Sequence, residues 1–229
     1  MQRRFFSRVL VSTSAWLIAD RCAFAASLSE TDAASGIRSL LERGAMSAIG
    51  LLGKNDGFLG NPLVRIPMPG YLQDAAKLLK AVGQQKRIDA LVLAMNRAAE
   101  AAMPEAKGLL VGAVKAMSVE DGLRIVRGGP TSATDYFAGK TRAPLAERFL
   151  PIVTRATEKV QLADRYNKVA AKAAGLGLVK GDESNVQKYV TSRALDGLFL
   201  MIGEEERKIR KDPVATGSAI LKKVFGALK

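Results

Sequence analysis

Apolar residues recur at spacings of three and four along almost the whole chain, and this helical period constrains the fold most strongly. The clearest example lies within 185–210, where Leu195, Leu198, Phe199 and Ile202 share one helix face. No stretch alternates apolar and polar residues over the length of a β-strand. We therefore predict an all-α fold, a single-domain bundle of about eight helices.

Local start and stop signals agree with this periodicity. Asp32 is the expected cap of the first helix, and Gly53 is expected to end it. Ser118, followed by Glu120 and Asp121, is expected to cap a short helix. A hydroxyl can accept hydrogen bonds from first-turn amides, and acidic side chains favour the positive end of a helix.

Prolines place further boundaries, since proline lacks an amide hydrogen and clashes with the preceding helical turn. Pro104 is expected to open a fourth helix and Pro213 a C-terminal helix. Thr131 is expected to cap a short helix that ends before Pro144, which opens the next one. Within that next helix we expect a kink or a break at Pro151.

Residues 54–70, KNDGFLGNPLVRIPMPG, interrupt the helical pattern. Their Asn-Asp-Gly, Asn-Pro and Pro-x-Pro elements predict a non-helical connecting segment, with a brief extended stretch left open at 64–66. A second helix is expected at 71–83. One helix before the segment is too little for a separate domain, so we interpret 26–229 as a single helical domain.

The last long helix, at about 185–210, changes character along its length. Residues 194–202 contain Asp196 as the only charged group, so we expect this half to be buried. Beyond Gly203 the sequence is highly charged, and we expect the helix to emerge there into solvent. A carboxylate in apolar surroundings needs a partner, so we expect an arginine beside Asp196.

The charged half of this helix has an acidic block followed by a basic one. Its order predicts ion pairs four residues apart, Glu204 with Lys208 and Glu206 with Arg210. Helix stabilisation accounts for the pattern. The alternative is that Glu204, Glu205 or Glu206 contributes to an acid–base pair.

Asn96, Arg97 and Glu100 form a polar group on the helix expected at 88–102. Asn96 and Glu100 share a face, and Arg97 can reach Glu100 three residues on. An ion pair on a solvated face is the favoured interpretation, because such pairs are common. A buried polar cluster that lines a groove is the alternative.

The first 25 residues have the three parts of a secretory signal peptide. Arg3, Arg4 and Arg8 precede an apolar run at 9–19, and Ala-Phe-Ala at 23–25 fits the cleavage pattern. The apolar run is too short for a transmembrane helix, which needs about 20 residues. We predict cleavage after Ala25 and an exported, periplasmic protein without a membrane span.

Two further details concern the export route and lipidation. Arg3-Arg4-Phe5-Phe6 is similar to a twin-arginine signal, so the general secretory and the twin-arginine routes both stay open. Cys22 follows Asp20-Arg21, whereas a lipoprotein signal has small or apolar residues before its cysteine. We therefore expect no lipid anchor.

The composition excludes several kinds of chemistry. The chain has no histidine, and its one cysteine, Cys22, lies in the predicted signal peptide. Catalysis by serine–histidine or cysteine–histidine pairs is therefore excluded, as are conventional zinc sites. We expect no metal and no cofactor.

The mature chain is strongly basic. The signal peptide contains four of the 35 lysines and arginines and one of the 22 acidic residues, so 31 and 21 remain, a net charge of +10. Basic proteins favour anionic partners, and in an exported protein these are envelope lipids or polymers rather than nucleic acid. Since the basic residues are spread along the chain, a role in solubility alone stays open.

Four segments carry a resemblance to a known family: KNDGFLGNPLVRIPMP (54–69), MNRAAEAAMPEAK (95–107), FLPIV (149–153) and ALDGLFLMIGEEERKIRKDP (194–213). They resemble the bacterial, exported family called domain of unknown function 4197. The resemblance covers about 28–225 and implies compartment and fold class, but no activity, cofactor or catalytic residue. Within the shared motifs it places the candidate binding residues Asn96, Arg97, Glu100, Asp196, Glu204, Glu205 and Arg210.

These observations lead to one functional hypothesis and two alternatives. The hypothesis is a non-enzymatic binding or structural module for an anionic envelope polymer, a lipid or another envelope protein. The first alternative is a carboxylate-dependent hydrolase or lyase, in which Glu100 or Asp196 faces one of residues 204–206 across a cleft. The second is a helical lipid carrier, which needs an enclosed apolar cavity lined by leucine and methionine.

Overall fold

The structure is a computed structural model that describes residues 29–70, 85–158 and 185–226, with isolated residues at 73, 81, 83, 163–164, 166–168 and 171. The predicted signal peptide lies outside the described residues, as does nearly all of the predicted helix at 71–83. Every regular element within the described residues is a helix, so the all-α prediction is confirmed. None of these helices is both long and apolar enough to cross a lipid bilayer.

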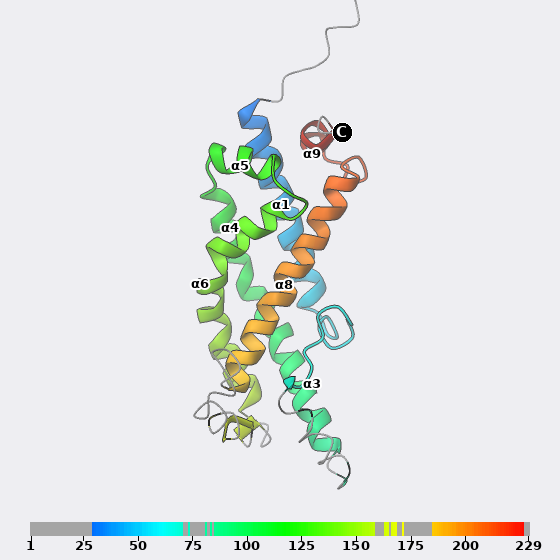
Figure 1. Cartoon of the computed structure of the whole chain (residues 1–229), viewed down its shortest axis with the longest axis vertical. Coiled ribbons are helices and arrows are strands. Elements are labelled where there is room, and N and C mark those ends of the chain that lie inside the picture. Colours follow the sequence, from blue (N-terminus) through cyan, green and yellow to red (C-terminus); the bar gives the residue numbers. More distant parts are fainter. Residues whose placement is uncertain are drawn as a thin grey trace, which may run out of the picture.

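The elements pack into an elongated bundle (Figure 1). In chain order they are α1 (Glu30–Leu52), α3 (Gln85–Ala102), the single-turn 3-10 helix η2 (Met103–Glu105), α4 (Ala106–Lys115), α5 (Val119–Val126), α6 (Ser132–Thr157), α8 (Val186–Lys211) and α9 (Ala219–Gly226). Helix α8 contacts α6 and α1 extensively, and α5 and α9 pack on α1. The C-terminal helix α9 therefore lies at the same end of the bundle as the start of α1.

Two helix starts show how hydroxyl caps set the boundaries. Helix α5 begins after Ser118, which forms the predicted cap: its Oγ accepts from the Asp121 N–H at 3.1 Å. Helix α1 begins earlier than predicted, because Ser29 rather than Asp32 is the cap. The Asp32 N–H donates to Ser29 Oγ at 3.0 Å, so Asp32 lies inside the first turn. Gly53 ends α1 as predicted.

Helix α6 runs without interruption through Pro144 and Pro151, so the boundaries predicted there are wrong. The carbonyls that these prolines leave without an amide partner belong to Lys140 and Glu147. Both residues are exposed, so water can satisfy the carbonyls. The opposite face of α6 carries a buried stripe with a residue at every fourth position: Phe137, Thr141, Leu145, Phe149, Val153 and Thr157. Packing of this stripe outweighs the cost of the two prolines.

The other two proline predictions are also displaced. Pro104 lies within η2, two residues before α4 begins at Ala106. The C-terminal helix begins at Ala219 rather than at Pro213. Before it the chain makes a turn in which Gly217 has a φ of 66°. A left-handed residue cannot continue an α-helix, so α9 starts only beyond it.

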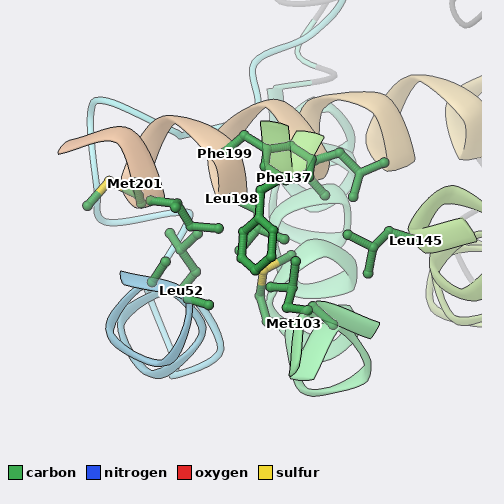
Figure 2. Close-up of a cluster of buried hydrophobic side chains, with 14 of the residues drawn as sticks. Leu52, Met103, Phe137, Leu145, Leu198, Phe199 and Met201 are labelled. Carbon is green, nitrogen blue, oxygen red and sulfur yellow. The ribbon is translucent and has the colours of Figure 1, made fainter. Parts of the chain in front are cut away.

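One continuous cluster of buried apolar side chains joins the described helices. Figure 2 shows its middle, where the ring of Phe137 from α6 lies between Leu198 of α8 and Met103 of η2. All three side chains are fully buried. The predicted burial of residues 194–202 holds for most of that stretch, although Leu200 stays 39% exposed.

Candidate functional site

The connecting segment, residues 54–70, is held against α3 by buried polar side chains. Asn96 of α3 is fully buried. Its Oδ1 accepts the Ile66 N–H at 2.9 Å, and its Nδ2 donates to the Ile66 carbonyl at 2.9 Å and to the Val92 carbonyl at 2.8 Å. One side chain therefore satisfies both backbone groups of Ile66, as a neighbouring β-strand would do.

Glu100 holds the first half of the segment in a similar way. Glu100 is only 4% exposed, and its Oε1 accepts the N–H groups of Phe58 and Leu59 at 3.0 and 3.2 Å. Oε2 accepts from Arg97 at 2.6 Å, and the other end of the Arg97 guanidinium donates to Asp56 at 2.8 Å. Hydrogen bonding to Glu100 and then to Asp56 raises the pKa of Arg97.

These contacts correct the interpretation of Asn96, Arg97 and Glu100. The Arg97–Glu100 ion pair forms, but Asn96 and Glu100 are buried rather than on a solvated face. The buried polar atoms point at the backbone of the connecting segment, where they satisfy groups that have no helical partner. The three residues therefore position the segment.

The outer side of the segment is exposed, and its side chains alternate between exposed and buried positions. Leu63 is 64% exposed and Arg65 is exposed, whereas Val64 and Ile66 are buried. Asn61 fixes this arrangement: its side-chain oxygen accepts the Leu63 N–H at 3.1 Å, and its carbonyl accepts the Arg65 N–H at 2.9 Å. No strand is formed at 64–66 in the part of the chain that the structure describes.

A hollow of about 440 Å³ separates the segment from α8, and we call it the segment groove. Leu63, Arg65 and Met68 line it from the segment, and Arg193, Asp196 and Leu200 line it from α8. Beneath it the segment packs tightly on α8, because a side chain at Gly197 would place its Cβ 2.8 Å from the ring of Phe58. The Tyr189 hydroxyl also donates to the Pro67 carbonyl at 3.0 Å.

Arginines outnumber carboxylates at the segment groove. Asp196 accepts from Arg142 at 2.7 Å and from Arg193 at 3.5 Å, so the predicted arginine partner is present. Among the described residues, the side chain of Arg65 has no hydrogen-bond or ion-pair partner. In the part of the chain that the structure describes, the three arginines and Asp196 together carry a charge of +2, which suits an anionic ligand.

A second, larger hollow of about 810 Å³ lies on the α3 side of the same segment. Leu59, Arg65 and Met68 line it from the segment, and Lys86 and Leu93 line it from α3. Arg65 and Met68 therefore border both hollows. The segment, whose backbone is the cyan loop beside the bundle in Figure 1, therefore forms a ridge between the two hollows.

Glu206 is buried, although it is expected from the sequence to lie at the surface. It lies on α8 beyond Gly203, where the helix was expected to emerge, yet it is fully buried. Its carboxylate accepts the N–H groups of Ala133 and Thr134 at 3.0 and 2.8 Å and the Thr134 hydroxyl at 2.7 Å. Glu206 thus caps the start of α6, a role that was predicted for Thr131, which forms no side-chain cap.

Arg210 shares this buried site. Its Nε donates to Glu206 at 2.8 Å, so the predicted Glu206–Arg210 pair is confirmed. Its Nη2 donates to the Ile125 carbonyl at 3.1 Å and to Ser132 Oγ at 2.9 Å, and its guanidinium lies over the ring of Phe225. Arg210 therefore ties α8 to the end of α5, the start of α6 and α9.

The remaining acidic candidates form ordinary surface pairs. Glu204 pairs with Arg207 at 2.5 Å instead of with Lys208. Glu205 pairs with Lys208 at 2.7 Å, and this hydrogen bond raises the pKa of Lys208. Both pairs join residues three apart on α8.

The acids named for the enzyme hypothesis do not face one another. Glu100 is buried beneath the connecting segment, Asp196 lines the segment groove, and Glu205 lines a separate hollow of about 640 Å³ against α1. Each carboxylate is engaged by a different arginine or lysine. The described residues also contain no group of three potential metal ligands. The pair that acid–base chemistry needs is therefore not formed by these residues.

Comparison with known proteins gives one family. A family model described as "Protein of unknown function (DUF4197)" matches residues 27–226, a range that contains every described helix. The family resemblance of the four sequence segments is thereby confirmed. No curated protein and no solved structure matches the chain.

Proposed function

The chain belongs to the DUF4197 family of proteins of unknown function, and from this premise we propose that it is a non-enzymatic binding module for an anionic component of the bacterial cell envelope. In this proposal the signal peptide is cleaved after Ala25, and 26–229 acts in the periplasm as a single domain. The continuous core shared by the described helices supports the single domain.

The charge of the segment groove carries the proposal. Within the described part of the chain Arg65 has no hydrogen-bond or ion-pair partner, and Asp196 is shared by two arginines, so positive charge is left over beside a surface hollow. The mature chain adds a long-range attraction through its net charge of +10. An anionic ligand is the partner that this arrangement favours.

Binding to charged and neutral surfaces tests the proposal. We expect the purified mature protein to sediment with phosphatidylglycerol vesicles at low salt and not with phosphatidylcholine vesicles. Salt near 1 M should release it, since the screening length falls to about 3 Å. Polyphosphate serves as a soluble polyanion in a parallel arm. If the protein binds neither kind of vesicle nor polyphosphate at low salt, the proposal is contradicted.

A matched pair of variants separates the groove from general attraction. Arg65→Gln should weaken binding about fivefold, because a basic residue near an anionic surface contributes about 1 kcal/mol. Arg148→Gln removes the same charge from an exposed position on α6 away from the groove and should have a smaller effect. Equal losses for the two variants would mean that only net charge matters.

The two alternatives lack an observation in their favour. The enzyme hypothesis requires facing carboxylates, and the acids named for it are engaged separately. The carrier hypothesis requires an enclosed cavity, whereas each of the three hollows described above opens to solvent. The binding hypothesis needs neither feature.

A further inference from the structure

We propose that the connecting segment is a membrane-docking element: Leu63 enters the interface of an anionic lipid bilayer while Arg65 and Arg193 contact the lipid head groups. This inference rests on the proposed function and names the anionic partner as a lipid surface. The segment lies at the side of the bundle (Figure 1).

Exposed apolar side chains gather at this segment. Among the described residues five large hydrophobic side chains are exposed, and Leu63 is the most exposed of them at 64%. Leu200 lines the segment groove with Leu63, and Leu93 lines the hollow on the other side of the segment. Three of the five therefore surround one ridge, and such a patch marks an interaction surface.

The segment holds Leu63 outward rigidly. Val64 and Ile66 occupy the buried positions on the inner side, so Leu63 cannot turn into the core without displacing them. Asn96 fixes both backbone groups of Ile66, and Asn61 fixes the turn that carries Leu63. A side chain that is already held in its binding position loses little entropy on insertion.

The chemistry beside Leu63 selects lipid over a soluble anion. Arginine forms strong, directional hydrogen bonds with phosphate, and Arg65, at the edge of both hollows, is not paired with any other described residue. Phosphate or a polysaccharide would leave Leu63, Leu93 and Leu200 exposed to water. A bilayer supplies head groups and hydrocarbon at adjacent depths, which matches leucines placed next to arginine.

The tryptophan content of the chain permits a direct test. The only tryptophan, Trp16, lies in the predicted signal peptide, so the mature protein has none. Leu63→Trp in the mature protein therefore creates a single reporter at the ridge. Val214→Trp is the matched control, because Val214 is 61% exposed in the non-helical stretch between α8 and α9.

We expect phosphatidylglycerol vesicles to shift the emission of the Leu63→Trp protein to shorter wavelength and brominated acyl chains to quench it. The Val214→Trp protein should show neither effect. Leu63→Ala should weaken vesicle binding about tenfold, since removing the inserted apolar surface costs about 1.4 kcal/mol. Val214→Ala should bind as the parent does, and both alanine variants should melt at the parent temperature.

The outcomes separate this inference from the proposed function. If the parent binds the anionic vesicles but the residue-63 reporter is not quenched, or Leu63→Ala binds normally, the docking element is wrong and the proposed function stands. If polyphosphate or an acidic envelope protein binds while the vesicles do not, the lipid partner is wrong. If no anionic probe binds, the proposed function fails as well.

Discussion

Two buried glutamates, Glu100 and Glu206, use the same geometry in different parts of the molecule. Each carboxylate accepts two consecutive backbone N–H groups from a distant segment. Each is also paired with an arginine of its own helix, Arg97 three residues before or Arg210 four residues after. A buried carboxylate survives in a core only when its charge is satisfied in this way.

We expect Glu206→Gln to lower the free energy of unfolding by about 3–5 kcal/mol, the cost of breaking a buried ion pair from one side. The amide would turn its NH2 donor toward the N–H of either Ala133 or Thr134, which different oxygens of Glu206 accept, and Arg210 would lose its carboxylate. Urea denaturation followed by circular dichroism measures the loss.

Glu205→Gln on the neighbouring position is the control for this measurement. Glu205 pairs with the exposed Lys208, so its replacement should change the free energy of unfolding by about 0.5 kcal/mol or less. Comparable losses for the two variants would show that Glu206 does not cap α6.

The position of Glu206 in the sequence indicates that it is buried, but its charged neighbours suggest the opposite. Glu206 continues the apolar stripe of α8, four residues beyond Ile202 and three before Ile209, which are both buried. A block of three glutamates suggests a solvated surface, so the stripe was assumed to end at Gly203. Glu206 accepts from backbone amides about 70 residues away. Because nearly every residue has a backbone amide, the sequence does not show which amides Glu206 will contact.

At the scale of elements, caps and apolar periodicity predicted the helix ends well where the contacts are local. The cap at Ser118, the stop at Gly53 and the span of α8 were all recovered. The prolines of α6 were misinterpreted, because the deciding factor is the packing of its buried stripe against α8 and α3. Tertiary packing of this kind is not visible in a local pattern.

Pro151→Ala should stabilise the protein. Pro151 is exposed in the interior of α6, where proline is about 3 kcal/mol less favourable than alanine in a helix. We expect a gain of about 1–3 kcal/mol, since the folded backbone has already adapted to the ring. In a chain of this size each kcal/mol raises the melting temperature by about 2–4 °C.

Pro104→Ala provides the comparison for Pro151→Ala in the same thermal melts. Pro104 lies in the first turn of η2, where a missing amide hydrogen costs little. Its replacement should leave the melting temperature nearly unchanged. A lower melting temperature for Pro151→Ala than for the parent would mean that the proline ring contributes to packing that the exposed position does not suggest.

For the whole molecule, fold class and family could be predicted from the sequence, whereas the proposed binding surface could not. In the sequence, 77 positions separate Arg65 from Arg142 and 51 separate Arg142 from Arg193. The sequence therefore gives no sign that these basic residues are close together. The fold brings them to one groove because the connecting segment and α6 both pack on α8. The positive charges of these arginines are therefore close together only in the folded chain.

The proposed export would depend on the predicted signal peptide at residues 1–25, and one substitution there tests it. We expect the full chain, expressed in a bacterial host, to be recovered from the periplasm beginning at Ala26, as intact mass would show. Ala25→Leu should leave the precursor uncleaved, because the position before the cleaved bond requires a small side chain. Phe24→Leu, at the unconstrained middle position of Ala-Phe-Ala, should be processed normally. Recovery of the uncleaved parent from the cytoplasm would contradict the periplasmic assignment and, with it, the envelope partner that the binding proposal needs.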